Sequence, residues 1–284
     1  MISTNRTSRT ITERMGFGFM RAAAIINIGS LLAIIGLIVV ERPAGALVGV
    51  FDRSAPQHDD GRRDLALFGR TFLCGRALVI ALPLGVMSAV YLHEYAKDSA
   101  WVTLTRLSIA NLAGVPSIVF GLFGLTFFVV FCGFGVSLLS GILTLAVLSL
   151  PIIINTTEAA LSQVPQEWRE ASLALGASRF ETVTKVILPN ALPGVLTGSI
   201  LALSRAAGET AAIMYTGSVF SLEDGASLFE PVMALPYHIY VMATSGTNIE
   251  ATRPLQYGTA LVLLLLVLVM SSAAIWLRER RRSR

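Results

Sequence analysis

The chain is divided into long apolar blocks separated by shorter polar ones. Crossing the hydrocarbon core of a bilayer takes about 20 mostly apolar residues. Six segments meet this requirement, two of them divided only by the turn Cys132-Gly133-Phe134-Gly135: 22–40, 72–92, the two parts of 107–157, 193–217 and 260–277. The pattern predicts an all-α integral membrane protein with six transmembrane helices.

Charged residues are placed so that they orient these spans. The N-terminal tail, residues 1–21, and the C-terminal tail, residues 278–284, are rich in arginine, whereas the loop 218–256 carries four acidic residues against a lone Arg253. Segments rich in Lys and Arg stay on the cytoplasmic side of a membrane. We therefore expect both termini in the cytoplasm, a six-helix domain over residues 22–277, and the 218–256 loop outside.

The first apolar segment has an alternative interpretation as a signal peptide, because Ala44-Gly45-Ala46 resembles a signal-peptidase site. The apolar run of 19 residues at 22–40 is longer than the apolar core of a signal peptide, which is about 7–15 residues. Cleavage would also leave five spans. We therefore expect this segment to be retained as the first span.

Composition supports a membrane protein and excludes several other classes. Hydrophobic residues make up 54% of the chain and charged residues 14%, against about a quarter charged in soluble domains, and the mean hydropathy is +0.69. The 2 Cys and 3 His are isolated along the chain, so no metal site is expected. The net charge of +4 is concentrated in the tails, which predicts contact with membrane lipid and not with nucleic acid.

The most conspicuous polar insert is the loop 158–190, between the fourth and fifth spans. Pro165 can open a helix at its first turn, and Gly176 can end that helix. Ser178-Arg179-Phe180-Glu181 has the form of a capping box, which starts a second helix that ends near Ile187, before two prolines. The sequence predicts a helix–turn–helix elbow that projects into the cytoplasm.

This elbow resembles the signature of ATP-binding-cassette (ABC) importer permeases, which is Glu-Ala-Ala, three residues, Gly, nine residues and Ile-x-Leu-Pro. The matching positions are Glu170, Ala171, Ser172, Gly176, Val186, Leu188 and Pro189. Ser172 replaces the second Ala and Val186 replaces Ile, both with side chains of similar shape. The resemblance implies the type I importer permease fold and a coupling helix that docks on a separate ATPase.

The same resemblance implies that this chain is not an enzyme. No G-x-x-x-x-G-K-[ST] motif occurs in the sequence, so the chain is not a P-loop nucleotide-binding protein. We expect it to bind no cofactor itself, with ATP and Mg²⁺ held by the partner ATPase.

Two opposite charges lie near the centre of the fifth span. Arg205 and Glu209 are four residues apart, so on a continuous helix they share one face. A central charge costs about 2.5–3.5 kcal/mol on insertion scales and usually faces a bundle interior or a water-filled cavity. Small residues are expected on or near the same face: Gly198, Ala202, Gly208 and Ala212. The pair is either a structural ion pair or part of a substrate path, in which the guanidinium could hold a tetrahedral oxyanion with two parallel hydrogen bonds.

The stretch 204–217 resembles the Arg-Ala-x-Gly-Glu-Thr motif of phosphate ABC importer permeases. Their PstA and PstC types share this motif, and the wider pattern resembles the PstA type more. The resemblance extends over 81–96, 111–125 and 149–165. It implies a path for inorganic phosphate that includes four neighbouring residues: Ser204, Arg205, Glu209 and Thr210.

The partners that this resemblance implies surround the chain on all sides. They are a sister permease that forms a heterodimer with it, a pair of ATP-binding subunits below, and an extracytoplasmic phosphate-binding protein above. The protein would be a multi-pass component of a bacterial plasma (inner) membrane. The outer loop 218–256 contains an apolar, proline-broken segment that suits an interfacial or re-entrant element. It could dock the binding protein or simply cover a gate.

Three other functions are compatible with parts of the sequence. The nearest is an ABC importer permease for another oxyanion, such as phosphonate, sulfate or molybdate. The second is an ion-coupled secondary transporter with Glu209 as its proton site, although no convincing internal repeat is present. The third is a membrane scaffold, which would leave the central charges without a purpose.

Overall fold

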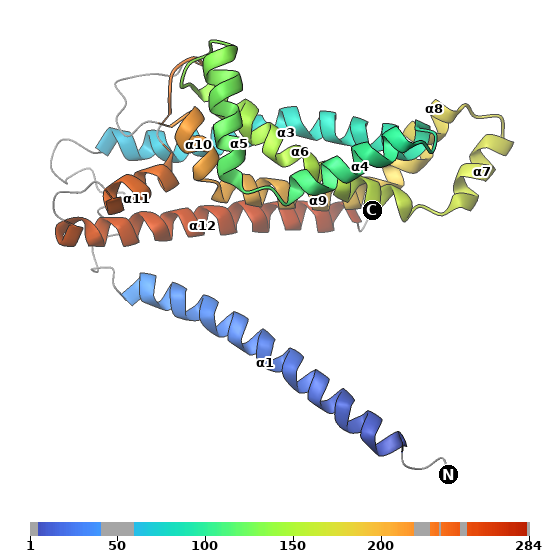
Figure 1. Ribbon diagram of the computed structural model, residues 1–284, viewed down its shortest axis with the longest axis horizontal. Coiled ribbons are helices and arrows are strands. Elements are labelled where there is room, and N and C mark those ends of the chain that lie inside the picture. The colour runs from blue at the N-terminus through green and yellow to red at the C-terminus, as the bar shows by residue number, and fades with distance from the viewer. Residues whose placement is uncertain (1–4, 41–59, 219–227, 233, 245–248, 283–284) are drawn as a thin grey trace.

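The computed structural model describes residues 5–40, 60–218, 228–232, 234–244 and 249–282, and it is helical throughout these ranges except for short connections and one isolated β-bridge between Ser218 and Val232 (Figure 1). The candidate signal-peptidase site Ala44-Gly45-Ala46 lies outside the described residues. Within these described ranges five helices are long and apolar enough to cross a membrane, and a bent pair makes six. The predicted all-α fold with six spans is confirmed.

The first span and the last are the long helices α1 (Asn5–Val40) and α12 (Ile249–Arg282), which contact each other. Helix α1 begins at Asn5, so the segment expected as a tail is helical and continuous with the first span. The N-terminal end of α1 and the C-terminal end of α12 lie at one end of the molecule, together with α7 (Gln166–Ala174) and α8 (Arg179–Thr182) (Figure 1). This arrangement places both tails on the side of the predicted elbow.

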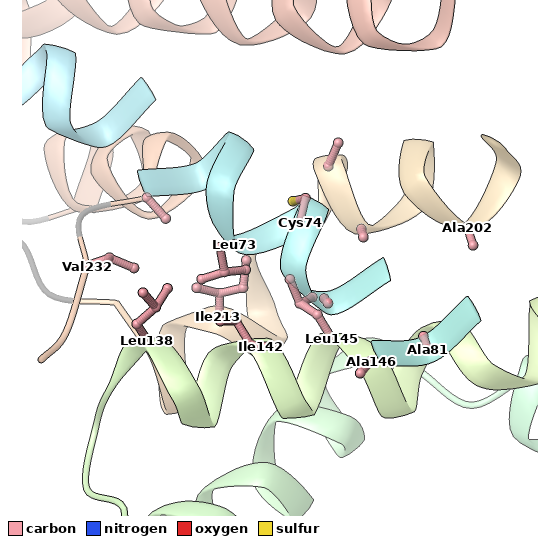
Figure 2. Packing of buried hydrophobic residues seen from close by; sticks show 14 of the residues in the cluster. Leu73, Cys74, Ala81, Leu138, Ile142, Leu145, Ala146, Ala202, Ile213 and Val232 are labelled. Carbon is pink, nitrogen blue, oxygen red and sulfur yellow. The ribbon is translucent and has the colours of Figure 1, made fainter. Parts of the chain in front are cut away.

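The centre of the bundle is the pair α3 (Asp60–Val90) and α6 (Leu138–Ser162). Leu73 of α3 and Leu145 of α6 are fully buried in the main apolar cluster, which Ile213 also enters (Figure 2). Helix α3 continues into one π-helical turn, η1 (Tyr91–Tyr95), at the elbow end. Because α6 also contacts the helices of the third and fifth spans, the α3–α6 pair forms the frame on which the other spans are positioned.

The third span is bent. Helix α4 (Ala100–Ala113) ends at Gly114, and α5 (Ser117–Gly124) begins after Pro116 and continues as the π-helical segment η2 (Leu125–Phe131). The axes on the two sides of this interruption differ by 105°. Proline has no backbone N–H and disfavours helical geometry in the residue before it, which accounts for the interruption.

The predicted turn between the third and fourth spans is confirmed. Gly133 and Gly135 have φ of +71° and +66°, which glycine adopts without the steric penalty of other residues. Ser137 then caps α6, because its hydroxyl accepts the backbone N–H of Ser140.

The fifth span differs from the prediction at both of its ends. At the elbow end, α8 continues through the π-helical turn η3 (Val183–Ile187) into α9 (Leu188–Gly208) without a break, so the prediction that the second elbow helix ends near Ile187 is wrong. At the other end α9 stops at Gly208, and a separate short helix, α10 (Ala211–Thr216), follows. The span that was expected to be continuous over 193–217 is therefore interrupted.

The described part of the outer loop contains α11 (Leu235–Thr244), which packs against α12 and α3. The backbone carbonyls of Leu228 and Glu230 accept the amides of Leu139 and Leu138, so this part of the loop is held on the start of α6. Its role in docking or covering stays a prediction.

Candidate translocation site and coupling elbow

Arg205 lies on α9 one turn before the helix ends, and its side chain is half-buried. One guanidinium nitrogen, Nη1, donates a long hydrogen bond of 3.5 Å to the carbonyl of Ala113, the last residue of α4. Among the described residues the other N–H donors of Arg205 have no partner. The charge therefore sits where the interrupted third span meets the interrupted fifth span.

Glu209 is the first residue after α9, with φ −71° and ψ 128°, and it is therefore not on a helix face shared with Arg205. The expected common face is wrong because the helix stops between the two residues. Glu209 is 8% exposed, and its Oε1 accepts the backbone N–H of Ala212 at 3.4 Å. This contact satisfies one of the free amides that begin α10. No ion pair joins Arg205 to Glu209 in the described part of the chain, so each charge is held separately.

Glycines of α5 allow the interrupted third span to approach the interrupted fifth span closely. A Cβ placed on Gly121 would come within 2.9 Å of the Ala211 carbonyl and 3.0 Å of the Ala212 Cα, and one on Gly124 would come within 2.7 Å of Thr216. Helix α5 therefore contacts the backbone of α10 directly. This close approach fixes α10, and with it the position of the helix break, against the third span.

The remaining predicted path residues divide into two groups. The Ser204 hydroxyl lies 2.8 Å from that of Ser271 on α12, so it links two helices. Thr210 is half-buried at the start of α10 and makes no side-chain capping bond. Thr210 therefore lies at the helix break with Glu209, whereas Ser204 is engaged in helix packing.

Three of the four small residues of the fifth span allow close packing of neighbouring elements, which is one role expected of small residues in a membrane helix. Ala202 and Ala212 are buried in apolar clusters. Gly198 faces α6 so closely that a Cβ on it would lie 1.9 Å from Thr156 Oγ1. Gly208 differs from these three, because it is exposed and has open space around it. Gly208 is therefore the one of these four residues that packs against no neighbouring element within the described part of the chain.

A cavity of about 470 Å³ opens between α6 and α9 on the elbow side of Arg205. Its walls include Thr156, Thr197, Gly198 and Leu201. Arg205 is one helical turn beyond Leu201 on the same helix. The cavity therefore approaches the guanidinium from the elbow end, although Arg205 does not line it.

The elbow has the local structure that the sequence predicts. Pro165 precedes α7, Gly176 has φ +88°, and Ser178 and Glu181 form a capping box with each other's backbone N–H groups. The predicted coupling residues divide by exposure: Glu170, Ala171, Gly176 and Pro189 are exposed, and Ser172, Val186 and Leu188 are half-buried. Side chains of Leu175 and Phe180 are 89% and 68% exposed at the tip. An exposed apolar tip on a well-capped elbow is suited to contact with another protein.

Ser172, one of the two departures from the family signature, has a clear contact. Its hydroxyl lies 2.9 Å from the buried hydroxyl of Thr182. An alanine at this position could not make that bond. The substitution therefore adds a polar link between α7 and α8.

Two charged contacts at the elbow end were missed by sequence reasoning. Arg169 pairs with Glu94 at 3.0 Å, and Arg106 lies 3.3 Å from Glu158 while it also donates to the Leu92 carbonyl. The sequence did indicate charged contacts in this region, because these four charged residues lie just beyond or near the ends of the apolar spans. Their pairing over 75 residues in the first case could not be read from the sequence.

Comparison with known proteins gives a consistent result. Residues 81–283 match the family described as "Binding-protein-dependent transport system inner membrane component". The chain is 34% identical to "Probable ABC transporter permease protein YqgI" of Bacillus subtilis (strain 168), over 95% of this chain and 96% of that protein. It is also 34% identical to "Phosphate transport system permease protein PstA" of Xylella fastidiosa (strain Temecula1 / ATCC 700964), over 89% of this chain and 90% of that protein.

Solved structures resemble the chain in fold. A chain of the MetNI methionine ABC transporter in an inward-facing conformation has a TM-score of 0.62 at 23% identity, covering 76% of this chain and 94% of that one. A chain of a bacterial ABC transporter involved in import of the acidic polysaccharide alginate has a TM-score of 0.68 at 14% identity, covering 97% and 99%.

Proposed function

The chain belongs to the family of binding-protein-dependent transport system inner membrane components, and on that basis we propose that it is the PstA-type permease subunit of an ATP-driven importer of inorganic phosphate. It works in the plasma membrane and catalyses no covalent chemistry. The similarity to PstA proteins over most of the chain supports phosphate as the substrate.

One observation carries the proposal, namely the state of Arg205. A guanidinium stays charged in any protein environment and has five N–H donors. Here it has one long hydrogen bond and no carboxylate partner among the described residues. A half-buried cation with free donors beside a helix break is suited to a visiting tetrahedral oxyanion, which would accept two parallel hydrogen bonds.

Glu209 and Thr210 complete the proposed path at the break. The carboxylate of Glu209 uses one oxygen on the amide of Ala212, and in this proposal its negative charge at the break limits how tightly an anion is retained beside Arg205. Helix interruptions in transporters supply backbone groups at the substrate site in this way. Ser204 contributes by holding α9 on α12.

The elbow supplies the coupling. We place it in the cytoplasm, with α7 and the exposed residues around Glu170 and Gly176 against a separate ATPase that holds ATP and Mg²⁺. Since α8, η3 and α9 form one continuous helix, a displacement of the elbow is transmitted to Arg205 without an intervening hinge. A sister permease completes the passage, and an extracytoplasmic phosphate-binding protein delivers the substrate to the outer face.

The test is phosphate uptake by the complete complex in reconstituted vesicles. Loss of a charged hydrogen bond of about 1.5–3 kcal/mol predicts that Arg205→Gln lowers uptake about 10- to 100-fold with normal assembly. The matched control is Lys97→Gln, an exposed cation after η1, which leaves uptake unchanged. Undiminished uptake in Arg205→Gln would remove this residue from the path.

The same vesicles separate the rival functions. Competition with sulfate, molybdate or a phosphonate reports the substrate, and phosphate is expected to compete best. Uptake that continues without ATP and follows a proton gradient would instead indicate a secondary transporter.

A further inference from the structure

The side chain of Arg169 on α7 joins three separate elements. Its Nε and Nη2 donate to Glu94 Oε1 on η1, at 3.3 and 3.0 Å. Its Nη2 also donates to the Leu161 carbonyl on α6 at 2.8 Å, and its Nη1 donates to the carbonyl of Val164. The side chains of Arg169 and Glu94 are only 11% and 12% exposed.

These contacts suit the charge of each element. The end of α6 presents backbone carbonyls, and the Leu161 carbonyl, which also accepts the Val164 N–H, gains a cationic donor that complements the helix dipole. Glu94 is the acidic residue that ends the second span, and His93 Nδ1 lies 2.9 Å from the same carboxylate oxygen. Since removal of one partner strands a buried charge, such a pair resists separation far more than an exposed one.

Two consecutive residues of α7 therefore lie in different surroundings. Glu170, in the family signature, is exposed, whereas Arg169 points into the base of the elbow, beside a cavity of about 480 Å³ that both partners of the pair line. From the outer face α7 can contact an ATPase. From the inner face it is tied to η1 and α6.

We propose that Arg169 and Glu94 are positioning residues that transmit motion of the coupling helix into the second and fourth spans. The inference rests on the proposed function and extends it. Motion of the elbow then reaches the membrane by two routes. One runs through α8, η3 and α9 to Arg205, and the other runs through the Arg169–Glu94 pair to α3 and α6, the frame of the bundle. Moving both together tilts the cavity wall on α6 with the wall on α9.

The first experiment measures the ratio of phosphate transported to ATP hydrolysed by the complete complex in vesicles. For Arg169→Gln this ratio falls about tenfold or more, because a buried charge pair is lost. Basal ATP hydrolysis per assembled complex stays within about twofold of the parent, and the ratio is compared per assembled complex because loss of a buried charge pair lowers stability. Arg169→Lys, which keeps the charge but cannot form the fork, gives an intermediate ratio. An unchanged ratio in Arg169→Gln overturns the proposal.

Lys185→Gln is the matched control, since it removes the same charge from the same loop. Lys185 pairs with Glu181 at 3.0 Å in an exposed position, and its loss leaves the ratio unchanged. If Arg169→Gln does not assemble, Arg169→Lys decides the matter, and a parental ratio in that complex overturns the proposal.

The second experiment measures the distance between the elbow and the end of the second span. Spin labels are placed at exposed Gln166, the first residue of α7, and at exposed Lys97 after η1, in a complex in which Cys74 and Cys132 have been replaced. The parent gives one narrow distance distribution, and Arg169→Gln broadens or shifts it. An unaltered distribution overturns the positioning role. A parent complex that moves no phosphate refutes the proposed function, and the spin labels still decide whether Arg169 positions α7.

Discussion

The two ends of α9 differ in whether the helix continues past residues that could interrupt it. At the elbow end the helix carries Pro189 and Pro193 and continues without a break from α8. At the other end no proline is present, and the helix stops at Gly208. Prolines, which usually end helices, are thus tolerated in the continuous segment α8–η3–α9, which we call the rod. The helix breaks instead at its other end, where the fifth span meets the interrupted third span.

The reasons lie in what surrounds each end. Before Pro189 the chain makes a π-helical turn in which the Leu188 N–H bonds the Val183 carbonyl, and such wider turns re-satisfy backbone groups near proline. After Gly208, Glu209 is extended, its carboxylate accepts an amide of α10, and α5 is pressed on α10 at Gly121. The rod is maintained by local bonding and the break by tertiary contacts.

The largest expected effect comes from adding one methyl group to the rod. In Gly198→Ala the new Cβ meets Thr156 at 1.9 Å, which forces α9 away from α6 and costs about 1–3 kcal/mol. Gly208→Ala is the matched control at the broken end, where the space is open. Thermal unfolding of the purified complex measures both. Equal midpoints for the two variants would show that α9 is not held on α6 as tightly as the comparison requires.

A second prediction separates the two properties of Glu209, its hydrogen bond and its charge. Glu209→Gln keeps an oxygen for the Ala212 amide, so the helix break and stability are retained. Glu209→Ala loses the cap, at about 1 kcal/mol. Because the charge beside the path is lost in both, phosphate uptake falls about tenfold in each variant.

Uptake and thermal unfolding of the same preparations distinguish the two properties. Parental uptake by Glu209→Gln, together with impaired Glu209→Ala, would mean that Glu209 only stabilises the break. The difference between the two ends of α9 would then be structural and not part of transport.

What could be predicted from the sequence were features fixed by nearby residues. The turn at Gly133 and Gly135, the helix end at Gly176 and the capping box of Ser178 and Glu181 each depend on a few consecutive positions, and each is present. The apolar spans follow in the same way, because the length of a membrane helix is set by the bilayer.

The features that could not be predicted depend on distant partners. The break after Gly208 depends on Gly121 of α5, and the position of Arg205 on the Ala113 carbonyl. The Arg169–Glu94 pair joins the fourth–fifth connection to the second span. At Pro189 the local rule that proline ends a helix gave the wrong answer. At the other end the uniformly apolar span concealed the break after Gly208, where α5 is pressed on α10.

The smallest expected effect is that of restoring a backbone donor in the rod. Pro193 is exposed inside α9, and its helix is continuous despite it. Pro193→Ala adds an N–H that can bond the Pro189 carbonyl, but the helix is already formed, so stability changes by less than about 1 kcal/mol and uptake stays within about twofold. Thermal unfolding and uptake measure this. A clear loss of uptake with unchanged stability would mean that the proline shapes the motion, and the elbow end of α9 would then be a hinge and not a rod.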